Sequence, residues 1–107
     1  MTELEMQIVG IISTAGDSKG KAFEALKMVK EGNYSEARAL LEESRKIDLE
    51  AHKIQTKLIQ SEMDPDADKT PITLLMVHAQ DHYMTSQLAR DLIETLVDVF
   101  ESKEGGK

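Results

Sequence analysis

The sequence contains no cysteine and no tryptophan, and aromatic residues make up only 4% of the chain. Without cysteine, disulfides and thiolate metal sites are excluded, and the chain is suited to the reducing cytoplasm, where we expect it to act. No apolar run approaches the length of a membrane span, and residues 1–5 lack the basic and apolar regions of a secretory signal. We therefore expect no insertion into a membrane.

Basic residues are also scarce relative to acidic ones. The formal net charge of −7 argues against a partner that is itself a polyanion, such as nucleic acid. A chain of 107 residues is long enough for one modest core, so we expect a single domain over residues 1–107.

What the chain does contain is helix-forming sequence with apolar residues at helical spacing. The pattern predicts three helices at about 3–30, 34–63 and 71–102, with fraying over 101–107. Gly32 ends the first helix, and Asn33 with Glu36 predicts a capping box for the second. Gly16 and Gly20 interrupt the first helix, and we interpret them as sites where a neighbouring backbone packs closely.

The second connection, residues 64–69, is acidic and contains Pro65. Thr70 and Pro71 then provide an N-cap and a first-turn proline for the third helix. Three long helices joined by short connections predict an all-α, antiparallel up-down-up bundle.

The third helix carries the pattern around which the chain is organised. Twelve residues fall within a sector about 120° wide, the width of a stripe that faces a core. They are Leu74, Leu75, His78, Asp81, His82, Thr85, Ala89, Leu92, Ile93, Leu96, Val99 and Phe100. Further apolar residues lie outside this stripe, namely Met76, Val77, Met84 and Leu88, which suggests self-association.

Polar residues interrupt the stripe where more leucine would be expected. His78, Asp81 and His82 are expensive to bury unless they are paired or bound, which indicates a functional site. A neutral imidazole can accept a phosphoryl group, and the same spacing allows a divalent metal on one helix face. A polar layer that sets the helix register is a third interpretation. Counting heights along the bundle places polar residues of the other helices at this level, namely Ser13, Thr14, Asp17, Asp48, His52 and Gln55.

The segment from Thr73 to Thr85, TLLMVHAQDHYMT, closely resembles the phosphorylation-site helix of one protein family. The family is that of the lactose/cellobiose/chitobiose-type IIA proteins of the bacterial phosphoenolpyruvate-dependent sugar phosphotransferase system. Matching segments elsewhere are Ala15-Gly16-Asp17 with Glu24-Ala25-Leu26, and Glu50-Ala51-His52 with Gln55-Thr56. Where relatives more often carry an Ala-Arg-Ser-like run, this chain has Ser18-Lys19-Gly20.

The resemblance implies a homotrimeric phosphocarrier. His78 would accept a phosphoryl group on Nε2 from the phosphocarrier protein HPr and pass it to the cognate IIB component, for uptake of a disaccharide such as lactose, cellobiose or chitobiose. His82 would support His78, and Gln80 would be a donor at the subunit interface. Asp81 would meet its two copies on the threefold axis around one structural Mg²⁺.

Two other classes of function remain open at this point. One is a metal-dependent helical enzyme with His78, Asp81 and His82 as ligands. The other is a helical adaptor, because residues 32–37 are similar to the start of a tetratricopeptide helix, although one hairpin plus a helix is short for that repeat.

Overall fold

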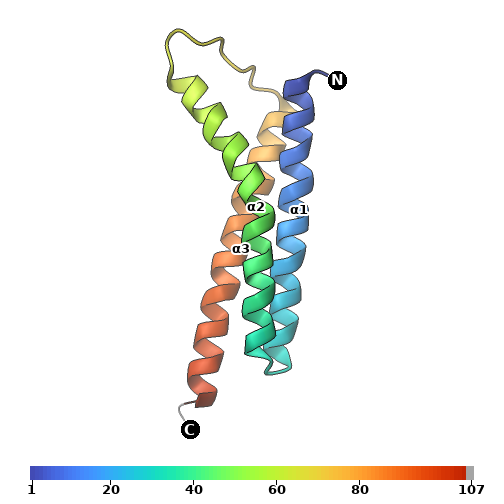
Figure 1. Ribbon diagram of the computed structural model, residues 1–107, viewed down its shortest axis with the longest axis vertical. Coiled ribbons are helices and arrows are strands. Elements are labelled where there is room, and N and C mark those ends of the chain that lie inside the picture. Colours follow the sequence, from blue (N-terminus) through green and yellow to red (C-terminus); the bar gives the residue numbers. More distant parts are fainter. Residues whose placement is uncertain (106–107) are drawn as a thin grey trace.

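A computed structural model describes residues 1–105 as three long helices (Figure 1). They are α1, Glu3–Lys30; α2, Tyr34–Met63; and α3, Leu74–Gly105. The chain runs down along α1, up along α2 and down again along α3, so that α1 and α3 are parallel. The result is a rod of 59 × 25 × 20 Å. The predicted all-α, up-down-up bundle is confirmed.

The first two helices begin and end at residues with clear capping roles. Thr2 and Glu5 form a reciprocal capping box at the start of α1, with 3.1 Å from the Glu5 amide to Thr2 Oγ1. Gly32 adopts a φ of +73°, which favours glycine, in the turn after α1. Asn33 Oδ1 accepts the Glu36 amide at 3.2 Å, but within the described residues Glu36 does not return the bond. The predicted capping box of α2 is therefore only half formed.

The third helix begins later than predicted. Thr70 and Pro71 lie in the connection, and Thr73 is the residue that caps α3, since its Oγ1 accepts the Met76 amide at 3.1 Å. The physical reason is local: β-branched Ile72 and Thr73 are poor first-turn residues, whereas a threonine just before Leu74 is a good cap.

The end of α3 also differs from expectation. The helix continues to Gly105 instead of fraying from residue 101, while Gly106 and Lys107 lie outside the described residues. Arg38 of α2 holds Glu101 at 2.6 Å, and the Tyr34 hydroxyl donates to Glu104. These contacts tie the last turns of α3 to the start of α2.

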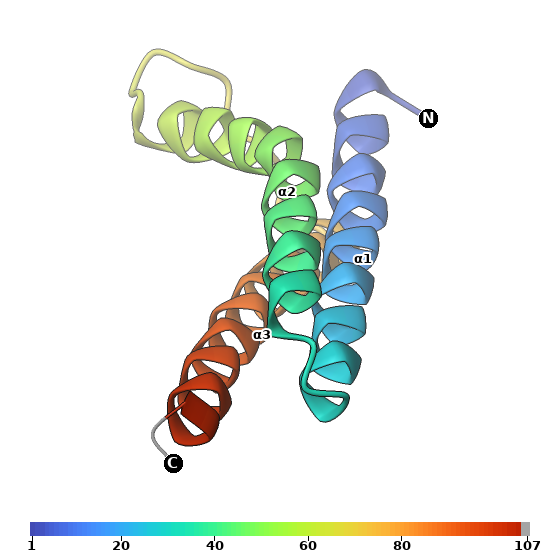
Figure 2. The ribbon, with the colours of Figure 1, turned by 60° about the horizontal axis from the view of Figure 1, so that its bottom comes forward.

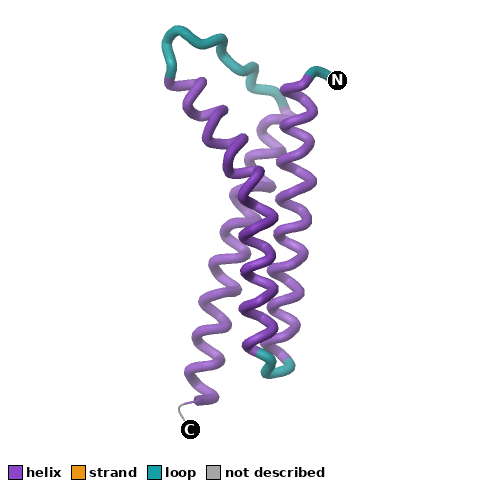
Figure 3. The backbone as a smooth tube through the Cα atoms, viewed as in Figure 1, coloured by secondary structure: helices purple, strands orange, loops and turns teal. Residues whose placement is uncertain are grey.

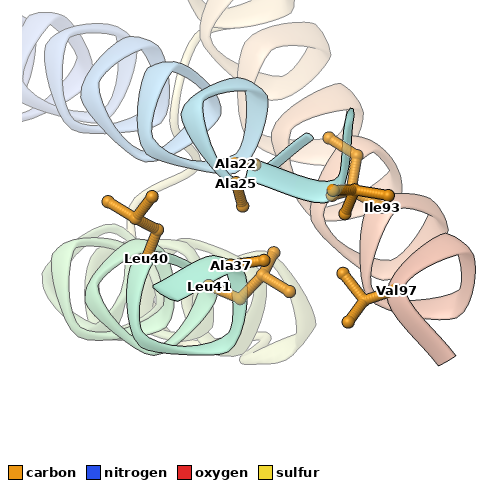
Figure 4. Packing of buried hydrophobic residues seen from close by; sticks show 8 residues of the cluster. Ala22, Ala25, Ala37, Leu40, Leu41, Ile93 and Val97 are labelled. Carbon is orange, nitrogen blue, oxygen red and sulfur yellow. The ribbon is translucent and has the colours of Figure 1, made fainter. Parts of the chain in front are cut away.

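Two apolar clusters form the core. The lower cluster joins small residues of α1 to branched residues of α2 and α3 (Figure 4). Its buried residues are Ala22, Ala25, Val29, Ala37, Leu40, Leu41, Ile93 and Val97. The upper cluster contains Ile8, Ile11, Ala51, Met76, Ala79 and Tyr83.

A buried polar layer separates the two clusters. Ser18 and Ser44 exchange hydrogen bonds between α1 and α2, with their hydroxyl oxygens 2.8 Å apart. Beside them, Arg90 of α3 donates to Asp48 of α2 over 2.5 Å. Because these groups have partners only in one register, the layer fixes how the three helices slide against one another.

The two glycines of α1 do not have the role we expected. Figure 2 shows α1 as one continuous helix, and its range of Glu3–Lys30 includes both Gly16 and Gly20. A Cβ placed on either glycine would meet nothing within 4 Å, so no backbone of this chain packs against them. The close-packing interpretation is wrong for the single chain.

The upper part of α2 leans away from the other two helices (Figure 3). Beyond Ala51 no residue of α2 is fully buried, and Ile59 and Met63 are largely exposed. A loop then arches back to the start of α3. None of the described helices is long and apolar enough to cross a membrane.

Candidate functional site

The face of α3 that packs against its own chain is not the face predicted from the sequence. The buried residues are Met76, Ala79, Tyr83, Ser86, Arg90, Ile93 and Val97. Of the twelve residues in the predicted stripe only Ile93 is among them, while Leu74 is 85% exposed and Leu92 57% exposed. The helix has apolar residues on two faces, and periodicity does not say which of them packs within the chain.

His78 therefore lies on the outer side of α3, where other molecules can reach it. Its imidazole is exposed and contacts that of His82 edge to face, with ring centroids 4.6 Å apart and planes at 83°. His82 is half-buried, and its Nδ1 is buried with no hydrogen-bond partner among residues 1–105. One accessible imidazole thus packs edge to face against a second, half-buried one.

Asp81 and Thr85 continue the same outer face. The Thr85 hydroxyl donates to the Asp81 carbonyl oxygen at 2.7 Å, as is common one turn apart in a helix. The Asp81 carboxylate is exposed and forms no hydrogen bond or ion pair within residues 1–105. Nothing in the described chain neutralises it.

The structure does not support the metal-enzyme interpretation. Among residues 1–105, no three His, Asp or Glu side chains are arranged to hold a metal ion, and the set His78, Asp81 and His82 is no exception.

Only part of the predicted polar band lies at the predicted height, and it lies on the other side of α3. Gln55 and His52 meet α3 at about the expected level, whereas Asp48 pairs with Arg90, five residues beyond Thr85. Ser13, Thr14 and Asp17 of α1 form no side-chain hydrogen bond with this group within residues 1–105. Residues of α2 meet the buried flank of α3 and not the outer face that carries His78. The pairs are Gln55–Gln80 at 2.6 Å, His52–Tyr83 at 2.9 Å and Asp48–Arg90 at 2.5 Å. His52, Gln55 and Asp48 are therefore separated from His78.

Gln80 belongs to this inner network. Its Nε2 donates to Gln55 Oε1 and lies 3.8 Å from the sulfur of Met76. In the single chain Gln80 points toward α2 and away from His78.

Tyr83 links the network to the core. It is 4% exposed, and its hydroxyl accepts from Gln87 Nε2 at 3.0 Å and contacts His52 Nδ1. Burial, and after it the negative charge of Asp48, raises the pKa of Tyr83 above its ordinary value.

A residue that the sequence reasoning did not place at the site is Lys19 of α1. Its Nζ donates to Thr85 Oγ1 at 3.1 Å. The sequence signal was the departure from the related Ala-Arg-Ser-like run, but nothing in that signal indicated which helix the side chain reaches.

Known protein families and structures match this chain over nearly its whole length, including α3. The family model described as "PTS system, Lactose/Cellobiose specific IIA subunit" matches residues 6–101. The chain belongs to this family. It is a component of a sugar phosphotransferase system, as the resemblance implied.

Relatives with assigned names cover nearly all of the chain. A "PTS system N,N'-diacetylchitobiose-specific EIIA component" of Escherichia coli K12 is 43% identical over 99 residues, covering 92% of this chain and 84% of the relative. A "PTS system lactose-specific EIIA component" of Staphylococcus aureus is 37% identical over 103 residues, covering 94% and 98%.

Solved structures agree with the architecture. The cellobiose-specific enzyme IIA from Bacillus anthracis superposes with a TM-score of 0.89 at 34% identity, covering 100% of this chain and 96% of that one. A IIA(Chitobiose)–HPr complex from Escherichia coli gives a TM-score of 0.79 at 40% identity, covering 97% and 99%. The IIA fold is therefore shared along its whole length.

Proposed function

We propose that His78 accepts a phosphoryl group from HPr on Nε2 and passes it to the cognate IIB component, in the cytoplasm. The observation that carries the proposal is the exposed imidazole of His78, braced by His82 on a face of α3 that the chain itself leaves open. The solved complex of a related IIA protein with HPr supports HPr as the donor.

For this phosphoryl transfer the protein needs mainly to expose the Nε2 atom of His78 to its two partners. The lone pair of the neutral Nε2 attacks phosphorus, while the bond from phosphorus to the donor breaks and its electron pair leaves with the donor. In the second step a nucleophile of IIB forms a bond to phosphorus while the bond to His78 Nε2 breaks and its electron pair returns to that nitrogen. Two different proteins must reach the same nitrogen, so an open helix face suits a carrier better than a closed cavity does.

We also propose that three copies assemble through the outer face of α3. Residues on that face recur every three or four positions, which is the spacing of a coiled-coil seam. They are Leu74, His78, Asp81, Thr85, Leu88, Leu92, Thr95 and Val99. At 100° per residue His78 lies at the edge of this row, so in the proposed trimer its imidazole would lie at the rim between two subunits, where HPr and IIB can still reach it. The leucines and valine of this row are 43–85% exposed in the single chain, more apolar surface than a lone helix normally leaves in water. In such a trimer Gln80 of one subunit would be a donor toward His78 of another.

Asp81 is the residue of this row that would hold a metal. Its carboxylate has no partner within residues 1–105, and three copies near one axis would repel each other. A hard divalent cation such as Mg²⁺ takes oxygen ligands of this kind, so the donor set fits one structural Mg²⁺ per trimer. The cation would be structural and would take no part in the phosphoryl transfer.

The function is tested by reconstitution with phosphoenolpyruvate, enzyme I, HPr and the cognate IIB. Wild type should transmit label to IIB, and His78→Gln should take up none. His52→Gln is the matched control, because His52 bonds Tyr83 on the other side of α3 and its loss should leave transfer intact. Normal transfer by His78→Gln would refute the proposal.

A further inference from the structure

Lys19 brings a positive charge from α1 to the edge of the His78 face. Its ammonium donates to Thr85 Oγ1 at 3.1 Å, and the same hydroxyl bonds the carbonyl oxygens of Asp81 and His82, at 2.7 and 3.2 Å. Through Thr85, Lys19 is thus connected to the turn of α3 that contains Asp81 and His82. That turn follows His78, the proposed phosphoryl acceptor.

The charge of Lys19 is not neutralised within the described chain. Lys21, Arg38, Arg45 and Arg90 each contact an acidic side chain, whereas Lys19 forms no ion pair within residues 1–105. Its partner Thr85 is neutral. Lys19 is also half-buried, so water screens its charge less than that of a fully exposed lysine.

The parallel course of α1 and α3 sets the distance to the acceptor. Lys19 is level with Thr85, which follows His78 by seven residues, or about 10 Å of helix axis at 1.5 Å per residue. Lys19 does not touch His78. At that distance a unit charge still changes an equilibrium that adds negative charge, by about two- to tenfold at low ionic strength.

We propose that Lys19 is a positioning residue that favours the phosphorylated state of His78 electrostatically. This inference rests on the proposed function. The chain has a net charge of −7, and Asp81 lies beside the acceptor, so both the approach of a phosphoryl group and its dianionic product are opposed by the protein's own charge. Lys19 offsets that repulsion from the α1 side without entering the bond-making step.

The test compares Lys19→Gln, Lys19→Arg and Lys27→Gln with wild type. Lys27 is the matched control because it lies on the same helix, is exposed, and forms no ion pair within residues 1–105. Two quantities are measured at low and at high salt. One is the equilibrium ratio of phosphorylated protein to phosphorylated HPr, and the other is the second-order rate constant for transfer from HPr.

For Lys19→Gln we expect both quantities to fall about two- to tenfold at low salt, with the difference shrinking as salt screens the charge. Lys19→Arg should retain wild-type values, and Lys27→Gln should change them less than twofold. A loss in Lys19→Gln that Arg does not rescue, or that salt leaves unchanged, would assign Lys19 a packing role and overturn the inference. Equal values for wild type and Lys19→Gln would do the same. An unlabelled wild type would instead refute the proposed function itself.

Discussion

Arg90 Nη1 and Asp48 Oδ2 lie 2.5 Å apart in the centre of the rod, where Arg90 is 9% and Asp48 3% exposed. The pair joins α3 to α2 between the two apolar clusters. Burying charges is costly, and the cost is recovered only while both partners are present.

Removing one partner should therefore be severe. We expect Asp48→Ala to lower the free energy of unfolding by about 3–5 kcal/mol, because it leaves the guanidinium of Arg90 buried and unpaired. Replacing both, as in Asp48→Leu with Arg90→Met, should cost less than Asp48→Ala alone. Urea unfolding followed by circular dichroism measures both. A single variant less stable by under about 1 kcal/mol would show that the pair is hydrated and not truly buried.

The raised pKa of Tyr83 predicts that the folded protein becomes less stable at alkaline pH. Its pKa is raised in the folded state, chiefly by burial, so above the ordinary pKa of 10.0 the unfolded chain loses the proton more readily than the folded one. The contribution of Tyr83 to the free energy of unfolding is complete below pH 10. It is lost as the pH rises through the raised pKa that Tyr83 has in the folded state. Tyr83→Phe should flatten this decline in urea titrations between neutral pH and base, relative to wild type. An unchanged decline would assign it to other groups.

The exposed apolar residues on the outer face of α3 predict that the protein forms a trimer in solution. Sedimentation equilibrium of wild type at micromolar concentration should give three times the chain mass of 12.0 kDa. Leu92→Glu should dissociate the trimer, because it places three carboxylates in an apolar seam. Leu49→Glu is the matched control, since Leu49 of α2 has the same exposure of 57% as Leu92 but lies off the seam. Equal masses for the two variants would contradict the proposed interface.

The proposed role of Asp81 is in assembly, as a ligand of a structural cation, and is distinct from the phosphoryl transfer on His78. If three Asp81 carboxylates share a cation, Mg²⁺ should raise the melting temperature of wild type relative to EDTA. Asp81→Leu should lose that response while melting at least as high, because packed apolar groups often replace a charge cluster without loss. Equal shifts by Mg²⁺ in both proteins would remove Asp81 from the metal site.

Local features of the fold were accessible from the sequence. Gly32 and Asn33 mark the first turn because left-handed backbone and helix caps are properties of single residues. The heights of His52 and Gln55 relative to α3 also followed from simple counting, since helical rise is constant, whereas Asp48 lies more than a turn from its predicted level. The start of α3 was misplaced because Thr70 and Thr73 both offer a cap, and the low helix propensity of β-branched Ile72 and Thr73, which favours the later cap, was not weighed.

The orientation of α3 was not accessible from the sequence. A helix that packs on its own chain with one face and, as we propose, on its copies with the other carries two apolar stripes. The stripe with His78 and Asp81 is the more regular, and periodicity favoured it as the core, whereas Ser86 and Arg90 made the true inner face look polar. Lys19 was missed because a long side chain reaches across helices in a way that spacing does not encode.

The central claim is that the phosphoryl group is carried on Nε2 of His78, and locating that bond tests it most directly. Protein phosphorylated through HPr and labelled with ¹⁵N should show phosphorus-to-nitrogen coupling at one imidazole, assigned to Nε2 of His78. The label should be stable in base and lost in acid. Coupling at His82 or His52, or phosphate on another residue type, would contradict the account.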